Sequence, residues 1–234
     1  MIIARRIIAD IDQQGLGPGD HLPSEKVMLE QYQVGRGTLR ESLRFLELSG
    51  AISLKPGPGG GPIVEKPEAS HLMNSLGLLL QFEGARFATI VEARVGLEPV
   101  MARLAAERIT DELRGRLAAA VATMREHTAD LSVFLEANRE FHNTIAWASG
   151  NPLFGFLIDA MDGVFAASSL GVDYPVQQRI MVLEADQAIF DAVMAGDPAE
   201  AEAAMRMHVS DWTRYLHAKF PAALAKPITW DGMQ

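Results

Sequence analysis

Apolar side chains recur every three or four positions through most of this chain, which is the spacing of one face of an α-helix. In the first fifty residues this spacing predicts three short helices, over residues 5–14, 25–32 and 34–49. Ser24 stands at the N-cap position of the second helix, where a hydroxyl can accept a backbone N–H. Gly15 and Gly50 follow the first and third helices, as expected of residues that end a helix.

A β-hairpin is predicted directly after the third helix. Residues 51–54 (AISL) and 62–65 (PIVE) read as strands, separated by a loop of prolines and glycines. Three short helices followed by a hairpin form the winged helix-turn-helix arrangement, in which the third helix enters the major groove of DNA and the hairpin is the wing. We therefore predict a winged helix-turn-helix DNA-binding domain over residues 1–66, with the wing and linker at about 55–68.

The remainder of the chain shows helical spacing and no strand pattern. Helices are predicted over residues 70–82, 87–108, 111–128, 131–149, 151–170, 176–195 and 198–219. The short loops between them predict antiparallel neighbours in a bundle. We expect an all-helical effector-binding and dimerisation domain over residues 69–220, followed by a C-terminal tail at 221–234. The fold class is thus mainly α, a winged helix-turn-helix joined to an all-helical antiparallel bundle.

The composition is that of a globular protein and excludes several kinds of chemistry. The 234 residues are 48% hydrophobic and 22% charged, and they include no cysteine. Disulfides, thiolate zinc sites and a cysteine nucleophile are thereby excluded. The N-terminal segment has arginines inside its apolar stretch, unlike a signal peptide, and the longest apolar stretch, near residues 76–80, is far too short to cross a bilayer. We therefore expect a cytoplasmic protein with no membrane partner.

The charge of the chain is unevenly distributed. The net charge is −9, yet residues 1–66 hold 8 Lys and Arg against 8 Asp and Glu, whereas residues 67–234 hold 13 against 22. A domain that approaches a polyanion need not be strongly basic, but it must present its cations on one surface. The neutral first part of the chain meets that condition if its cations are aligned.

Three arginines, Arg36, Arg40 and Arg44, are four residues apart in the stretch VGRGTLRESLR, so they share one face of the third predicted helix. This spacing is typical of a solvated helix face with partners such as Glu41. It also suits a DNA-reading helix, because an arginine can bond the O6 and N7 atoms of guanine together. The turn, the caps and the hairpin around this helix favour the DNA-reading interpretation. Arg44 lies a turn deeper than the other two and is expected to meet phosphate or nothing.

Five polar side chains fall on the apolar faces of the predicted bundle helices: Arg94, Asn138, His142, Asp186 and His208. Buried polar groups are costly unless they are paired or coordinated, so several of them in one region indicate a site. Three interpretations fit: a hydrogen-bonded polar core without metal, an ion pair between Asp186 and Arg94, or a site for a metal and an effector.

Two sets of motifs resemble a known family. PGDHLPSE followed by VGRGTLRESLRFLELSG resembles the DNA-binding domain of the GntR family of bacterial transcription regulators. EARVGLEPVMARLAAER (92–108), NREFHNTIAWASGN (138–151) and AIFDAVMAGDPAEAEAAMRMHV (188–209) resemble the helical C-terminal domain of the FadR subgroup, called FCD. The resemblance implies a homodimer that binds double-stranded, partly palindromic operator DNA under the control of a small effector.

The resemblance also implies roles for particular residues. The positions that match DNA contacts, including those of the wing, are Lys26, Arg36, Thr38, Arg40, Arg44, Lys55, Gly59 and Gly60. Gly35 and Gly37 stand where the family usually has Ser or Thr. Gly37 lies in the first turn of the helix and is expected to loosen it by about 0.5–1 kcal/mol relative to Ala.

Many members of the subgroup bind a divalent metal of the Zn, Ni or Mn type through an Asp or Asn and three His. The matching residues here are Asn138, His142, Asp186 and His208, so one histidine is replaced by a carboxylate. An oxygen-richer set favours harder metals or weakens zinc binding. Arg94 matches an arginine that often holds an effector carboxylate. We therefore expect a small organic or sugar acid as effector and a repressor as the function, with a metal-free or acyl-CoA-type effector site as the alternative.

Two other classes of protein fit the sequence less well. A metal-dependent hydrolase would explain the histidines and aspartate, but no nucleophile motif or glycine-rich phosphate loop accompanies them, and the DNA-binding part would be unexplained. An architectural DNA-binding protein would not need a polar pocket, and its wider surface would be basic. We therefore predict a transcription regulator and not an enzyme.

Overall fold

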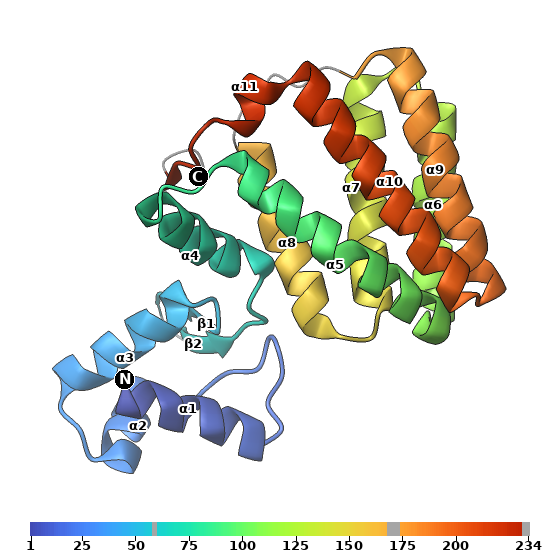
Figure 1. Cartoon of the computed structure of the whole chain (residues 1–234). Coiled ribbons are helices and arrows are strands. Elements are labelled where there is room, and N and C mark those ends of the chain that lie inside the picture. Colours follow the sequence, from blue (N-terminus) through green and yellow to red (C-terminus); the bar gives the residue numbers. More distant parts are fainter. Residues whose placement is uncertain (58–59, 168–173, 231–234) are drawn as a thin grey trace. The chain divides into compact units, whose positions relative to one another are not determined.

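The computed structural model describes residues 1–57, 60–167 and 174–230, and the chain divides into two compact units, Met1–His71 and Leu72–Gln234 (Figure 1). The first unit contains α1 (Ile2–Gln13), α2 (Glu25–Tyr32), α3 (Arg36–Leu48), β1 (Ile52–Lys55) and β2 (Gly61–Val64). The predicted order of elements is confirmed. The first helix begins earlier than predicted, because Ile3 and Ala4 are buried in the core of this unit.

The core of the first unit is a small apolar cluster shared by all three helices and the hairpin. It is formed by Ile3, Ala4, Ile7, Leu22, Met28, Tyr32, Leu39, Leu43, Leu46, Ile52 and Val64. Leu39, Leu43 and Leu46 recur at helical spacing along α3, so burying them turns the opposite face of this helix toward solvent.

The hairpin is antiparallel, with Ile52 opposite Val64 and Lys55 opposite Gly61. Each strand is shifted by one position from its predicted bounds. The first strand begins at Ile52 because the N–H of Ala51 donates to Leu46 O in the turn that closes α3. The turn segment before α2 pairs with the same hairpin: Leu22 N donates to Pro62 O at 2.9 Å. The turn motif and the wing are therefore joined by backbone hydrogen bonds.

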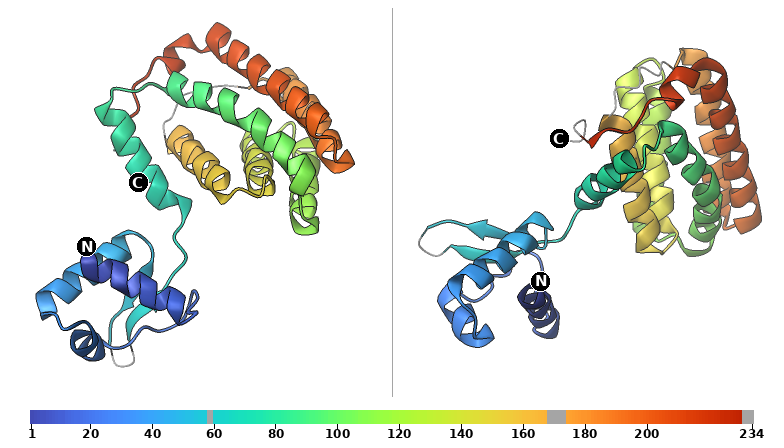
Figure 2. Two further views of the ribbon diagram at one scale, coloured as in Figure 1. Left: turned by 60° about the horizontal axis from the view of Figure 1, so that its bottom comes forward. Right: turned by 60° about the vertical axis from the view of Figure 1, so that its left-hand side comes forward.

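The second unit is a helical bundle. Its elements are α4 (Ala69–Phe82), α5 (Phe87–Arg108), α6 (Asp111–Glu126), α7 (Leu131–Ala148), α8 (Pro152–Ala167), α9 (Val176–Ala195), α10 (Pro198–Lys219) and α11 (Pro221–Leu224). The predicted helices are confirmed with small shifts at their ends, and the predicted end of α8 at residue 170 lies outside the described residues. α5 is central, since it packs against α7, α8, α9 and α10, and it runs beside α10 for most of its length (Figure 2).

Side-chain caps fix where the bundle helices begin. Thr110, Asp130 and Asp197 each accept a hydrogen bond from a backbone N–H three residues further on, at the starts of α6, α7 and α10. Gly196 ends α9 with a φ of 68°, which a residue without Cβ adopts easily. These local signals set the register of the helices that carry the buried polar residues.

The segment that was expected to be a C-terminal tail takes part in the bundle. It begins with α11, and Ile228 beyond it is only 1% exposed. The backbone of Ile228 donates to Ala85 O, and Phe87 N donates to Lys226 O. The predicted tail therefore applies at most to the residues after 228.

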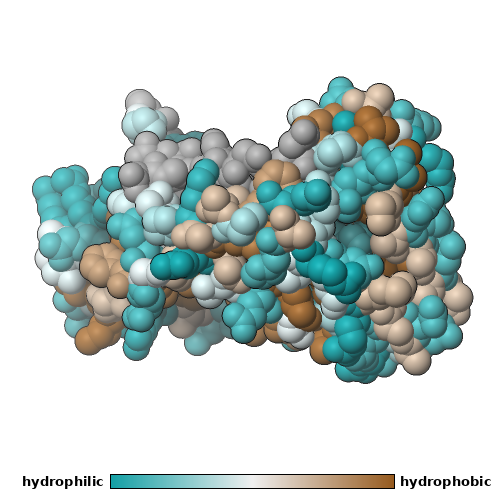
Figure 3. All heavy atoms as spheres, turned by 45° about the horizontal axis from the view of Figure 1, so that its top comes forward, coloured by the Kyte–Doolittle hydropathy of each residue, from teal (hydrophilic) through white to brown (hydrophobic). Residues whose placement is uncertain are grey.

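Figure 3 colours one face of the molecule by the hydropathy of its residues. The face drawn in Figure 3 is largely hydrophilic, with smaller apolar areas between the polar residues. Among the described helices, none is long and apolar enough to cross a membrane.

Candidate functional site

The cationic side chains of α3 lie on its solvent-facing side. Arg36, Thr38, Arg40 and Arg44 are exposed, as are Lys26 in α2 and Lys55 and Gly60 in the hairpin. Gly59 lies outside the described residues. The structure thus gathers the described members of the predicted DNA-binding set on the surface of one unit.

Two of these arginines are held by carboxylates, although not by the expected Glu41. Arg40 Nε donates to Glu25 Oε2 at 3.4 Å, and Arg44 Nη1 donates to Glu47 Oε2 at 2.6 Å. Exposed ion pairs of this kind contribute about 0–1 kcal/mol. Such pairs position the guanidinium groups and are weak enough to be exchanged for phosphate or guanine.

The start of α3 has no side-chain cap. Gly35 is the N-cap, with extended φ and ψ and no side chain to accept a hydrogen bond. A Cβ atom built on Gly35 or Gly37 meets nothing within 4 Å. Neither glycine is therefore required by packing within the unit.

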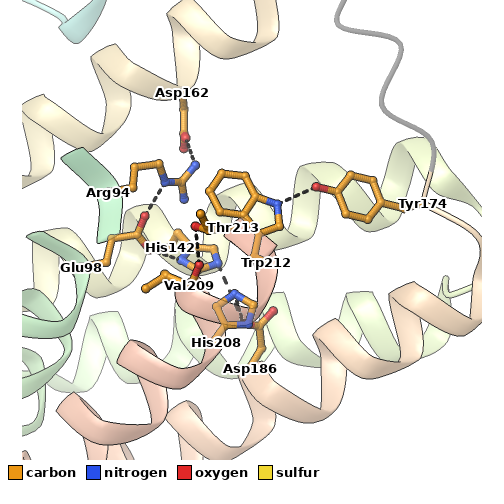
Figure 4. Close-up of polar contacts among 10 residues, drawn as sticks. All are labelled: Arg94, Glu98, His142, Asp162, Tyr174, Asp186, His208, Val209, Trp212 and Thr213. Atoms are coloured by element: carbon orange, nitrogen blue, oxygen red, sulfur yellow. Dashed lines mark hydrogen bonds and ion pairs between the residues drawn. The ribbon is translucent and has the colours of Figure 1, made fainter. Parts of the chain in front are cut away.

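The second unit contains a chain of buried polar side chains that crosses the bundle. It links all five polar residues singled out from the sequence with two further carboxylates, Glu98 and Asp162. Figure 4 draws all of these residues except Asn138. Asp186 is fully buried, and His142 and His208 are 5% and 7% exposed. Arg94 and Asn138 are partly buried.

Three side chains from three helices converge at the centre of this row of buried polar residues. His142 Nε2 in α7 and His208 Nε2 in α10 lie 3.9 Å and 3.5 Å from Asp186 Oδ1 in α9. The two imidazole rings stack, with centroids 5.2 Å apart. One ligand atom from each residue lies within 4.8 Å of the other two, a separation typical of atoms that share one metal ion.

Glu98 fixes which nitrogen of His142 faces this centre. Its Oε2 lies 2.6 Å from His142 Nδ1, and its other oxygen accepts from Arg94 Nε. Burial alone would raise the pKa of Glu98, but Arg94 and His142 hold it well below its usual range. Because Glu98 is ionised, His142 donates through Nδ1, and the neutral ring then presents the lone pair of Nε2 to Asp186.

Asp186 is incompletely satisfied by the protein. Asn138 Nδ2 donates to its Oδ2 at 2.9 Å, while no donor from the described residues reaches its buried Oδ1. Burial raises the pKa of Asp186 and lowers that of His208, so both groups resist carrying charge in this environment. An acceptor oxygen facing two imidazole nitrogens is an arrangement that a cation would satisfy, and the donor set therefore fits a divalent metal.

The interpretation that Arg94 pairs with Asp186 is wrong. Arg94 is bound on both sides by other carboxylates, because Nε donates to Glu98 and Nη1 donates to Asp162 Oδ1 at 2.8 Å. Its guanidinium also lies over the ring of Trp212, at 5.4 Å from the ring centroid. Trp212 Nε1 in turn donates to the hydroxyl of Tyr174 at 2.6 Å. Arg94 is thus held by two carboxylates and one aromatic ring within the protein.

A surface cavity of about 80 Å³ lies between α9 and α10. It is lined by Gln178, Met181, Val182, Ala185, Met207, His208, Asp211 and Trp212. His208 and Trp212 therefore face the polar chain with one part of the ring and this cavity with another.

The sequence reading missed Glu98 and Asp162. Glu98 lies four residues after Arg94, a spacing that places both on one face of α5 and that signals an ion pair. Asp162 lies four residues after the fully buried Ile158, whereas Asp159 in the same helix is only half-buried. That apolar spacing was a usable signal for burial, although it does not name Arg94 as the partner.

Two protein-family models and several known transcription repressors match the sequence of this chain. Residues 2–60 match the model of the bacterial regulatory proteins of the gntR family, and residues 89–211 match that of the FCD domain. The chain is similar to the HTH-type transcriptional repressor NanR of Cronobacter sakazakii, with 29% identity over 86% of this chain and 78% of that protein. The NanR of Escherichia coli K12 is 28% identical over 89% of this chain and 80% of that protein.

A solved structure shows the same fold. The Streptococcus agalactiae GntR structure superimposes with a TM-score of 0.71 and 26% identity, covering 91% of this chain and 98% of that chain. The two family models together include α3, which carries the exposed arginines, and the residues of the buried polar cluster. The chain therefore belongs to the GntR family of bacterial regulatory proteins, in the branch with an FCD domain, and is a ligand-responsive DNA-binding transcription regulator rather than an enzyme.

Proposed function

We propose that this protein is a repressor whose operator affinity is controlled by a small acid bound beside a divalent metal in the helical bundle. The observation that carries the proposal is the convergence of His142 Nε2, His208 Nε2 and Asp186 Oδ1, the last of which has no donor among the described residues. These three atoms are the proposed metal ligands.

The charges of the buried chain support a dication. When all three carboxylates are ionised and the histidines are neutral, Glu98, Asp162 and Asp186 outnumber the single guanidinium of Arg94, and burial raises the pKa of Asp162 and of Asp186 against this excess of negative charge. Burying uncompensated charge is costly. A divalent cation would neutralise that excess.

Two neighbours are proposed to orient the ligands rather than to bind the metal. Glu98 holds the Nδ1–H of His142, and Asn138 holds Oδ2 of Asp186, so each fixes the atom that turns toward the centre. Asn138 would become a fourth ligand only by giving up the hydrogen bond that its Nδ2 donates to Asp186 and turning its amide oxygen toward the metal. With three protein ligands, the metal keeps open coordination positions, and it would supply there a Lewis-acidic centre for a carboxylate or hydroxyl oxygen of the effector.

In the first unit, we propose that Arg36 and Arg40 read bases and that Arg44, Lys26 and Lys55 contact phosphates. Arg36 and Arg40 lie near the N-terminal end of α3, which is the part of a recognition helix that reaches base edges. The NanR relatives are named repressors, which favours repression here. A homodimer on a partly palindromic operator would supply two such helices, and the effector would act by binding more tightly to one arrangement of the dimer than to another.

Metal analysis tests the proposal at its centre. Protein purified without chelator or nickel resin is expected to contain about one divalent metal ion per chain, or to gain one from added zinc or manganese. The His208→Ala variant is expected to lose it, whereas His217→Ala, an exposed histidine of the same helix, keeps it. No metal in the wild-type protein and no change in melting temperature with either metal would reduce the cluster to a hydrogen-bonded polar core.

A further inference from the structure

Two exposed arginines of α3 differ in which edge of the guanidinium is occupied. Arg40 is held at its side, because its Nε donates to Glu25 Oε2 at 3.4 Å, and no described residue bonds to its two Nη groups. Arg44 is held at its tip, because its Nη1 donates to Glu47 Oε2 at 2.6 Å. Arg40 therefore presents a complete pair of terminal N–H donors, and Arg44 does not.

The free edge decides what an arginine can recognise. Guanine accepts two parallel hydrogen bonds from one guanidinium, at its O6 and N7 atoms. A guanidinium can donate such a pair from its tip, through both Nη groups, or from its side, through Nε and one Nη group. Glu25 occupies the side of Arg40, so the tip remains for a base. On Arg44 the carboxylate of Glu47 already takes half of the tip.

The position of Glu25 suits this role. Glu25 is the first residue of α2, where the N-terminal end of the helix favours a carboxylate, and α2 packs against α3 (Figure 1). The side chains of Arg40 and Glu25 are 71% and 46% exposed, so both lie at the surface of the unit. An ion pair this exposed contributes little to folding stability, and its main effect is on the orientation of Arg40.

We propose that Glu25 is a positioning residue for base recognition: it holds Arg40 with both Nη groups available to a guanine and disfavours the use of Arg40 on phosphate. This inference rests on the proposed function, in which Arg40 reads a base. Orienting the guanidinium beforehand reduces the side-chain freedom that is lost on binding. The carboxylate also offsets the charge of Arg40, which weakens its sequence-independent attraction to phosphates. Both effects favour the correct base pair over other DNA.

Fluorescence anisotropy titrations of the full-length chain test this role. The probes are a duplex selected from a random library, its single-base-pair variants and a random duplex. The base pair read by Arg40 is the one whose replacement no longer affects binding by Arg40→Ala. At that pair we expect the wild-type protein to prefer the selected base pair about tenfold. Glu25→Ala is expected to narrow this preference at least threefold and to bind the random duplex at least as tightly as the wild-type protein.

Two further variants separate positioning from a general change in charge. Glu47→Ala is the matched control, because it removes a carboxylate beside another arginine of the same helix, and it is expected to leave the preference at every base pair unchanged. The double variant Glu25→Ala/Arg40→Ala is expected to show the same preferences as Arg40→Ala, because Glu25 acts through Arg40. A merely structural role of Glu25 would weaken the binding of all duplexes alike and leave the preferences unchanged.

The possible failures are distinguishable. An unchanged preference in Glu25→Ala, an equal narrowing in Glu47→Ala, or a further loss of preference in the double variant overturns the role of Glu25 and leaves the proposed function in place. If Arg40→Ala keeps every preference of the wild-type protein, Arg40 reads no base and the inference falls with that assignment. If the wild-type protein binds no selected duplex more tightly than random sequence, the proposed function itself fails.

Discussion

Replacing Asp186 by Asn tests the buried cluster through two opposite effects. In the metal-free protein, Oδ1 of Asp186 is a buried acceptor that no described residue satisfies, and it faces the Nε2 atoms of His142 and His208. An Asn at this position would keep an oxygen for Asn138 and turn an N–H group toward the histidines. We therefore expect Asp186→Asn to stabilise the metal-free bundle, although it removes a charged partner.

The size of this stabilisation follows from the burial of the Asp186 carboxylate. An unsatisfied buried acceptor costs about 1–3 kcal/mol. In a unit the size of Leu72–Gln234, each kcal/mol moves the melting temperature by about 2–4 °C. The variant is thus expected to raise the melting temperature of the metal-free bundle by about 2–12 °C.

The effect of added metal should disappear in the same variant. At one hundred times its dissociation constant, a metal that binds only the folded state stabilises it by about 2.7 kcal/mol. For the wild-type bundle this corresponds to a rise of roughly 5–11 °C. Asp186→Asn is expected to reduce this rise to almost nothing, because an amide is a poor substitute for a charged ligand.

Differential scanning calorimetry of chelator-treated protein, with and without zinc, measures both effects and separates the transitions of the two units. Asp191→Asn is the matched control, because Asp191 is exposed in the same helix and accepts only from the neighbouring Gln187 among the bonds described. A lower melting temperature of metal-free Asp186→Asn, together with an undiminished response to zinc, would refute the reasoning.

Three further predictions concern the DNA-binding unit and pH. Arg40→Ala is expected to weaken operator binding by about 1–3 kcal/mol in a fluorescence anisotropy titration with the oligomeric state unchanged; unchanged affinity would contradict this. Gly37→Ala is expected to stabilise the first unit by about 0.5–1 kcal/mol in urea unfolding, because the added Cβ meets nothing; a destabilised variant would contradict it. Burial alone would lower the pKa of His142, but Glu98 raises this pKa above its ordinary value of 6.5. Protonation of His142 therefore stabilises the metal-free protein. This stabilisation is complete below about pH 6.5 and is lost as the pH rises through the raised pKa. Zinc affinity should follow the opposite trend and fall as the pH drops through that value, as zinc titrations at several pH values would show.

The helices and the hairpin were predictable because their signals are local. Leu39, Leu43 and Leu46 mark the buried side of α3 by spacing alone, and Gly196 with its positive φ ends α9 where the sequence indicates. The C-terminal segment was not predictable in this way. Ile228 is buried because its backbone pairs with Ala85, and that contact joins residues far apart in the sequence.

The same distinction applies to the buried polar chain. The placement of His142, Asp186 and His208 on apolar faces predicted their burial, and their convergence follows from the packing of α7, α9 and α10. The spacing of Glu98 along α5 signals it as one partner of Arg94, but no local pattern in the sequence shows that α8 lies opposite Arg94. The ion pair between Arg94 and Asp162 therefore emerges from the tertiary structure alone.

The response of operator binding to an acid tests whether a ligand in the helical bundle controls the DNA-binding unit. The zinc-loaded chain is titrated against an operator selected from a random duplex library, in the presence and absence of the acid that binds most tightly by calorimetry. We expect the acid to weaken operator binding at least tenfold for the wild-type protein and for His217→Ala, and to leave it unchanged for His208→Ala. The same response in all three proteins, or none in the wild-type protein, would contradict it.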